Sequence, residues 1–311
     1  MTSDLMFIGH VSMDQIENQH GTRVQAGGAA LYAAMAAGTL VRDVTLVSAI
    51  GKDYKFKDTL KPLNSTHVRA FNMPSTTFNI RYNKLGEAEY LKAVHGAGAK
   101  VTASAIPTRL LSPETMVHIT PMQPSKVRKI VHKIRKNSEK TRISINTWID
   151  YIKESRRNRT TLKSLVKEAD FFIVNDTEAK ALTQTDSIST ALSALEAKML
   201  IVTLGQLGAI IKEQNTAIQM VPALNVPIKN VIDTTGAGDT WCGAFLATYK
   251  LTQDLMKSVT IASIISSIKC AGWGLEKLRN LHFRKPDDVI EYVIGLKEGA
   301  LQKRIMDYTT R

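Results

Sequence analysis

The chain has 311 residues, 44 % of them hydrophobic, so it can bury the core of one large domain or of two smaller ones. No window approaches the roughly 18 uninterrupted apolar residues of a membrane span, and Met1 to Asp4 lack the features of a signal peptide. Two cysteines, Cys242 and Cys270, give neither a disulfide framework nor a metal-ligand pattern. We therefore expect a cytoplasmic protein without a membrane partner.

The chain is basic, with 41 Lys and Arg against 28 Asp and Glu and a net charge of +13. Much of this charge lies in two stretches, 126–142 and 153–167. In the first, Val127, Ile130 and Ile134 recur at helical spacing, which predicts an amphipathic helix with its charges on the outer face. Because aromatic residues are not interleaved with the charges, a solvated face is favoured over a nucleic-acid-binding patch. Nucleic-acid binding stays an alternative that the charge alone suggests.

The first part of the chain reads as strand, helix and strand. A buried strand covers 5–10, an Ala-rich helix opens near Gln25–Leu31 and runs to about Gly38, and a second apolar strand covers 44–51. This spacing predicts a parallel sheet with right-handed crossovers. Residues 77–81 and 89–94 flank a Gly-containing turn and predict an antiparallel hairpin.

Short apolar strands continue along the chain, separated by helical or loop-rich segments. They are predicted at 117–119, 142–145, 171–174 and 200–203, followed by a hairpin of 210–212 with 217–220 and a buried helix over 255–271. The simplest architecture that accommodates these elements is a single α/β domain over 1–311, with a doubly wound, mostly parallel sheet flanked by helices. We expect segments of about 14–26 and 76–96 to form a small β lid.

One stretch, Asp233–Phe245, has the character of a chemical site. After an apolar, extended lead-in over 226–232, small residues form a tight turn into a helix. The backbone amides of Gly236, Ala237 and Gly238 would have no intrahelical partners there, which favours anion binding. A carboxylate at Asp239 would repel an anion, so it makes sense as the acceptor of a proton from an attacking hydroxyl. The alternative is that Asp239 only caps the helix.

The string from Asp233 to Asp239 resembles the C-terminal signature of the ribokinase-like (PfkB) carbohydrate kinases, with every position matched. The resemblance implies transfer of a phosphoryl group from ATP with Mg²⁺, Asp239 as base, and Gly236, Ala237 and Gly238 as the anion hole. Asp233 and Thr235 match positions that help to hold K⁺ in many relatives, where carbonyls around 271–274 would complete the site.

Two features point to the acceptor side of such a site. Gly27-Gly28 could simply allow a tight turn, and Asp14 could be a turn residue. The resemblance implies instead that the glycines let the backbone approach a sugar and that Asp14 binds its hydroxyls. The commonest family pattern has an Asn where Leu31–Ala33 stand here, and only twelve residues separate Asp14 from Gly27. The corresponding piece is longer in ribokinases, so the lid is reduced here, and this argues against a lid-to-lid dimer of the ribokinase kind. Both a monomer and a homodimer stay open.

Two motifs between Asn146 and Asp233 match those that bind the nucleotide in this family, and they stand in the order that the resemblance implies. Asn175-Asp176-Thr177-Glu178 resembles the family motif that helps to place Mg²⁺ and phosphates, with Glu178 acting through water. It also fits a helix capping box, and the two interpretations are compatible. Thr203, Gly205 and Gly208 match the nucleotide loop of the family.

Asn146 ends the predicted central strand, where a side chain could face the substrate. Trp148, two residues further on, could belong to the core or form a sugar-stacking surface, and the core is favoured.

Together these features predict a kinase that phosphorylates a hydroxyl of a sugar or polyol. A nucleoside kinase shares every motif, and an aromatic pocket in the lid region would favour it. A non-catalytic ligand-binding protein on the same fold is the alternative of another class; such a protein usually lacks the acid that Asp239 provides.

Overall fold

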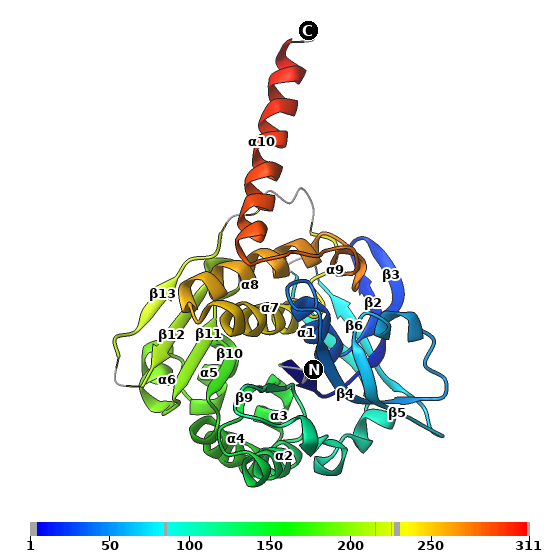
Figure 1. Ribbon diagram of the computed structural model, residues 1–311, viewed down its shortest axis with the longest axis vertical. Helices are drawn as coiled ribbons and strands as arrows, with labels where there is room; N and C mark the ends of the chain where they lie inside the picture. The colour runs from blue at the N-terminus through cyan, green and yellow to red at the C-terminus, as the bar shows by residue number, and fades with distance from the viewer. Residues whose placement is uncertain (1–4, 84–85, 215, 225, 227–230, 310–311) are drawn as a thin grey trace.

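A computed structural model of the protein describes residues 5–83, 86–214, 216–224, 226 and 231–309. Within these residues, nine strands form one main sheet (Figure 1). In spatial order they are β13 (Gln219–Val221), β12 (Ala209–Glu213), β11 (Met199–Thr203), β10 (Phe171–Asn175), β9 (Arg142–Asn146), β8 (Met116–Ile119), β1 (Leu5–Ile8), β4 (Val44–Gly51) and β5 (Asn64–Phe71). All pairs from β11 to β5 are parallel, and only β12 and β13 pair in the antiparallel sense. The predicted doubly wound α/β class is confirmed.

Helices cover both faces of this sheet, because a parallel sheet needs crossover connections that pack back onto it. One face carries α1 (Ala29–Ala37), α7 (Ala237–Thr252), α8 (Leu255–Cys270) and the short α9 (Glu276–Arg279). The other carries α2 (Pro124–Asn137), α3 (Ile149–Glu154), α4 (Arg156–Glu168), α5 (Asp176–Thr183) and α6 (Ile188–Ala194). Figure 1 shows these groups above and below the strands.

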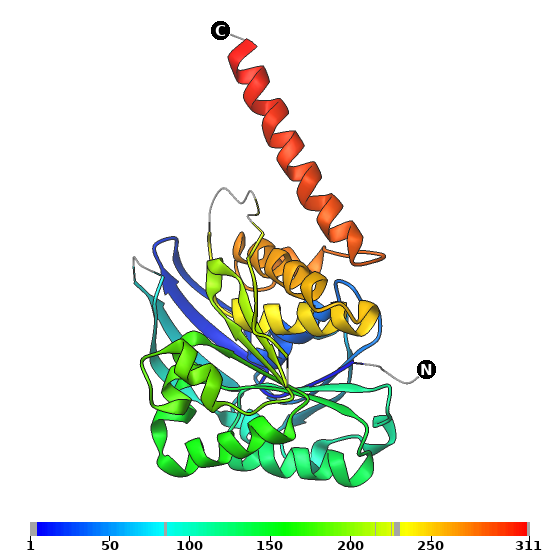
Figure 2. The same ribbon diagram turned by 90° about the vertical axis from the view of Figure 1, so that its left-hand side faces the viewer.

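The predicted amphipathic helix is α2, whose Val127, Ile130 and Ile134 are fully buried. The buried helix predicted over 255–271 is α8. The last helix, α10 (Asp287–Thr309), projects away from the body of the molecule (Figure 2). No helix in the described ranges is both long enough and apolar enough to cross a membrane.

A separate four-stranded sheet, which we call the small sheet, lies beside the main one (Figure 1). Its order is β3 (Gly21–Gly27), β2 (Ser12–Asn18), β6 (Thr76–Tyr82) and β7 (Ala88–Val94). β2 pairs with β6 in parallel, so Asp14 stands opposite both Gln25 and Phe78. The small sheet buries Ile16 and Ile80 on its inner face.

Some predicted segments fall partly outside the described residues. These are the turn of the β6–β7 hairpin at 84–85, the tip of the β12–β13 hairpin at Asn215, and most of the apolar lead-in over 226–232. Short 3-10 turns complete the structure at Lys57–Leu60, Gly96–Lys100, Ala103–Ala105, Thr108–Leu110 and Gly205–Leu207.

Candidate active site

The carboxyl ends of three neighbouring parallel strands bring the predicted polar residues together. β9 ends at Asn146, β10 at Asn175 and β11 at Thr203, and the register pairs Asn146 with Ile173 and Asn175 with Thr203. In open α/β sheets ligands bind at this edge.

The turn before α7 requires a glycine at Gly236. The amide of Ala237 donates to the carbonyl of Thr234 (3.0 Å), and Gly236 has φ 72° and ψ 12°, as in the third position of a type II turn. A β-carbon at Gly236 would lie 2.3 Å from the ring of Tyr32. Backbone conformation and close packing therefore both exclude a larger residue.

This turn changes the set of amides that can bind an anion. The Ala237 amide was expected to be free, but closing the turn uses it. Within the described part of the chain, Gly236 and Gly238 donate their amides to no protein acceptor. These two amides lie at the positive end of the sixteen-residue helix α7, which favours an anion there.

Asp239 lies in the first turn of α7 and is partly exposed. The side-chain amide of Asn146 donates to its Oδ1 at 3.2 Å. The surrounding protein removes water from the carboxylate, and this desolvation raises the pKa of Asp239 to about 6, although the Asn146 hydrogen bond acts in the opposite direction. A carboxylate with this pKa is suited to accept a proton near neutral pH. Asn146 thus contacts the predicted base.

Asp14 is almost completely buried, and glycine makes room for it. A β-carbon at Gly27 would lie 1.7 Å from Asp14 Oδ2, and one at Gly28, which has φ 99°, would lie 2.4 Å from the carbonyl oxygen of His10. Burial raises the pKa of Asp14 to about 7, and the charge of Asp233 adds to the shift. The two glycines therefore shape the wall that carries Asp14.

Around Asp14 and Asn146, several buried polar atoms have no hydrogen-bond partner among the described residues. Such atoms are costly to leave unpaired and mark places where a polar ligand can bind. They are His10 Nδ1, Ser12 Oγ, Asp14 Oδ1, Gln25 Oε1, His95 Nδ1, Asn146 Oδ1 and Thr147 Oγ1.

An aromatic wall, formed by Phe78, Tyr90, Trp148 and Tyr151, lies beside these polar atoms. The ring of Trp148 contacts Phe78 and Tyr90 of the small sheet, with centroids 6.3 and 4.9 Å apart, and Tyr151 at 5.5 Å. The expectation that Trp148 belongs to the core is wrong, since it is partly exposed and packs on the small sheet. The sequence shows these rings but not that they meet, because they come from three separate segments: β6, β7 and the stretch after β9 that leads into α3.

Asn175 and Glu178 form the capping box that their spacing allows. The Glu178 amide donates to Asn175 Oδ1 (2.8 Å), and the Asn175 amide donates to Glu178 Oε2 (3.0 Å). Burial raises the pKa of Glu178 to about 8, with the charges of Asp239 and Asp176 as smaller causes. Glu178 and Asp239 therefore share one electrostatic environment, in which a cation would be favoured.

The predicted nucleotide loop follows β11. Thr203 ends that strand, and the positive φ angles of Gly205 (58°) and Gly208 (110°) shape the next turn. A β-carbon at Gly208 would lie 2.0 Å from the carbonyl oxygen of Val221, whereas one at Gly205 would meet open space. Gly208 is thus required by the turn itself, and the exposed Gly205 leaves room for a ligand.

The buried Asp233 connects the motif with the small sheet. Its carboxylate accepts hydrogen bonds from the amides of Thr235 (2.8 Å) and Gly274 (2.9 Å) and from Gln25 Nε2 (2.9 Å). The Lys269 ammonium donates to its carbonyl oxygen. Burial acts to raise the pKa of Asp233, but Lys269 and these hydrogen bonds outweigh it and hold the pKa below its usual value. Neither Gln25 nor Lys269 was predicted as a site residue.

Thr235 makes a second connection of this kind, since its hydroxyl donates to that of Tyr82 on β6 (3.0 Å). A further bond runs from Asn18 Nδ2, at the end of β2, to the carbonyl of Ile232 (2.9 Å).

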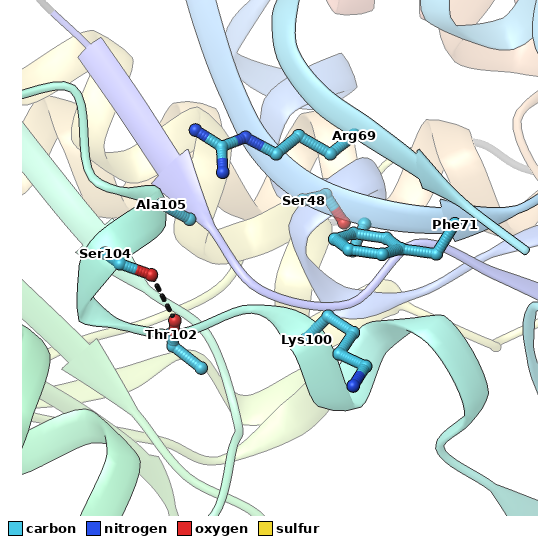
Figure 3. A pocket seen from close by; sticks show the side chains of 8 residues that line it. Ser48, Arg69, Phe71, Lys100, Thr102, Ser104 and Ala105 are labelled. Atoms are coloured by element: carbon cyan, nitrogen blue, oxygen red, sulfur yellow. Dashed lines mark hydrogen bonds between the residues drawn. The ribbon is translucent and has the colours of Figure 1, made fainter.

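A surface pocket of about 270 Å³ lies elsewhere (Figure 3). Arg69, Phe71 and Lys100 line it together with the hydroxyls of Thr102 and Ser104, which are 2.8 Å apart. None of the predicted site residues lines this pocket.

Comparison with known proteins identifies the family of the chain and, with it, a phosphotransferase that has an alcohol group as acceptor. Residues 2–276 match the pfkB family carbohydrate kinases, and the chain belongs to this family. A cytidine kinase of Thermococcus kodakarensis is 28 % identical over 286 residues, which cover 89 % of this chain and 95 % of that protein.

Solved structures share the fold at lower identity. The adenosine kinase of Sinorhizobium meliloti superposes with a TM-score of 0.77 at 16 % identity, covering 89 % of this chain and 98 % of the other. An E. coli protein described as a ribokinase II, in complex with ATP and Mg²⁺, gives a TM-score of 0.75 at 16 % identity, covering 94 % and 99 %. The predicted ribokinase-like kinase family is confirmed.

Proposed function

We propose that this kinase transfers the γ-phosphoryl group of ATP to a hydroxyl of a small molecule that contains a sugar or polyol unit, with Asp239 as base. The observation that carries the proposal is the placement of Asp239 beside the free Gly236 and Gly238 amides, with its pKa raised to about 6.

In this mechanism Asn146 holds the Asp239 carboxylate toward the acceptor hydroxyl. Asp239 takes the proton as the hydroxyl oxygen bonds to the γ-phosphorus and the bond to the ADP oxygen breaks. The amides of Gly236 and Gly238 stabilise the charge that spreads over the transferred oxygens, which is the main source of catalysis in phosphoryl transfer.

The nucleotide would lie over Asn175, Thr203, Gly205 and Gly208 at the neighbouring strand ends. Mg²⁺ supplies charge neutralisation for the phosphates when it is bound with ATP. Burial raises the pKa of the Glu178 carboxyl, and a nearby cation would offset this effect. Glu178 is therefore a suitable residue to hold Mg²⁺ through a bound water. Asp14 and the unpaired polar atoms around it would bind the hydroxyls of the acceptor.

A nucleoside is the second candidate for the acceptor, and the aromatic wall favours it over a free sugar. Stacking of a base on an aromatic side chain contributes about 1–3 kcal/mol, and a base presents a planar ring to such a wall, whereas a free sugar presents only a C–H face. The similarity to a cytidine kinase agrees with this choice. The small sheet would then act as the predicted lid, holding the base against Trp148.

The experiment that tests the proposal is a panel of sugars, polyols and nucleosides with ATP and Mg²⁺, followed as ADP release. Turnover with at least one sugar-containing acceptor is expected. If no member of the panel releases ADP above the acceptor-free rate, the proposed function is wrong.

The pH dependence of kcat tests the assignment of Asp239. Only the ionised carboxylate accepts a proton, so at saturating acceptor kcat should rise with pH up to about 6 and level off above it. Saturation removes effects on acceptor binding, including those of Asp14. A kcat that stays constant down to about pH 4, the usual range of a carboxyl pKa, would contradict the assignment.

Replacing Trp148 with Ala tests the nucleoside choice. The KM for nucleosides should rise about tenfold or more, since one stacking surface is lost, and the KM for free sugars should stay nearly unchanged. Trp273→Ala is the control, because Trp273 contacts Arg23 and is not part of the aromatic wall. Equal effects of Trp148→Ala on both acceptor classes would argue against a stacked base.

A further inference from the structure

Lys269 is a lysine whose side chain is fully buried near the end of α8. Its ammonium donates to the carbonyl oxygen of Asp233 at 2.8 Å, lies 3.5 Å from Asp233 Oδ2 and stands 5.2 Å from the ring centroid of Tyr32. An ammonium is expensive to remove from water and is retained in an interior only with close compensating partners. Here the buried ammonium lies against Asp233, the first residue of the turn for which we propose anion binding.

Helix α8 holds this turn at both of its ends. Lys269 binds the carbonyl of Asp233, and Ser266, one helical turn earlier, donates to the carbonyl of Ala237 at 2.8 Å. The residues between these two anchors include Gly236, whose amide belongs to the anion site. Tyr32 packs against both Gly236 and the Lys269 ammonium. This residue lies in the segment 31–33, where the commonest family pattern has an Asn, so an aromatic side chain has a packing role there.

The resemblance implied a K⁺ ion beside Asp233 and Thr235, and Asp233 is the residue that Lys269 contacts. Asp233 presents both its carbonyl and one carboxylate oxygen to Lys269, and Gly274 turns its amide, a donor, toward that carboxylate. The charge of Asp233 is thus already compensated from within the chain. A second monovalent cation beside the ammonium would meet strong like-charge repulsion at this depth.

We infer that Lys269 is a positioning residue whose ammonium replaces a bound monovalent cation, holding residues 233–238 in the shape that binds the transferred phosphoryl group. The inference rests on the proposed anion-binding role of that turn. It proposes Lys269 in place of the K⁺ site expected at Asp233 and Thr235, and it predicts a kinase that is active without K⁺.

The first test uses the wild-type protein, with tetramethylammonium as the sole monovalent cation. Addition of K⁺ or NH₄⁺ should change kcat by less than about twofold, because the position is already filled. Activation by about tenfold or more would overturn the inference. If no acceptor is turned over in any buffer, the proposed function fails, and the Kd of MgATP with and without K⁺ then supplies the readout.

The second test removes the ammonium. Lys269→Met keeps a long side chain and should lower kcat by about a hundredfold. Lys269→Ala also leaves space, so NH₄⁺ or methylammonium should restore much of its activity, whereas the bulky tetramethylammonium should not. Lys257→Met, on the same helix and paired with Asp287, is the matched control and should retain wild-type activity.

A residue with a purely structural role would give another pattern. Loss of activity in Lys269→Ala that no small cation restores, in protein with native circular dichroism, would overturn the inference. So would wild-type kcat in Lys269→Met without K⁺. If neither variant folds, the cation dependence of the wild type decides alone.

Discussion

Replacing Asp239 with Asn is expected to lower kcat by about 10³-fold while the Kd of MgATP stays within about twofold. The amide has the shape of the carboxylate and can still accept the bond from Asn146, but it cannot take the proton of the acceptor. Steady-state ADP release gives kcat, and titration calorimetry gives the Kd.

The matched control is Asp186→Asn, the same change at an exposed loop position. It should leave both quantities unchanged. Should Asp239→Asn turn over at a rate near that of the wild type, the base must be sought elsewhere.

Gly236→Ala is expected to cause the second large loss. The new methyl would meet the ring of Tyr32 at 2.3 Å, in a residue with φ 72°. The strained backbone alone costs about 1–3 kcal/mol. Since relief of the collision must move the turn, kcat should fall by about 10²-fold or more as the amides of Gly236 and Gly238 leave their positions. Activity assays and thermal unfolding of the same preparation separate the two effects.

Gly86→Ala provides the comparison for this variant. Gly86 also has a positive φ (79°), but a β-carbon there meets nothing within 4 Å. It should show the loss of stability that follows from φ alone, with little change in kcat. If Gly236→Ala behaves in the same way, the turn before α7 is not the anion site.

Much of the fold could be predicted because its signals are local. Strands β9, β10 and β11 are short, largely apolar runs that end in a polar residue, as at Asn146 and Asn175, and the capping box of α5 is visible as Asn and Glu three residues apart. The turn at Gly236 is similarly local, since glycine adopts its positive φ without the steric cost that a side chain would add.

The parts that sequence did not predict depend on contacts between distant segments. Lys269 is one of two lysines in a mostly apolar helix, and only the packing of α8 against Asp233 shows that its ammonium is buried in an ion pair. The aromatic wall joins β6, β7 and the segment after β9. The Ala237 amide was misjudged because a turn that is closed by a hydrogen bond and an open one share the same sequence signature.

The bonds between the small sheet and the motif have a consequence for the motion of the site. Gln25 donates to Asp233, Thr235 donates to Tyr82, and Asn18 donates to the carbonyl of Ile232, so the small sheet is hydrogen-bonded to the turn for which we propose anion binding. Any outward swing of the sheet breaks these bonds and loosens the turn. Motion of the small sheet and the geometry of the turn are therefore coupled, and an acceptor that holds the sheet in place would also hold the proposed anion site in its working shape.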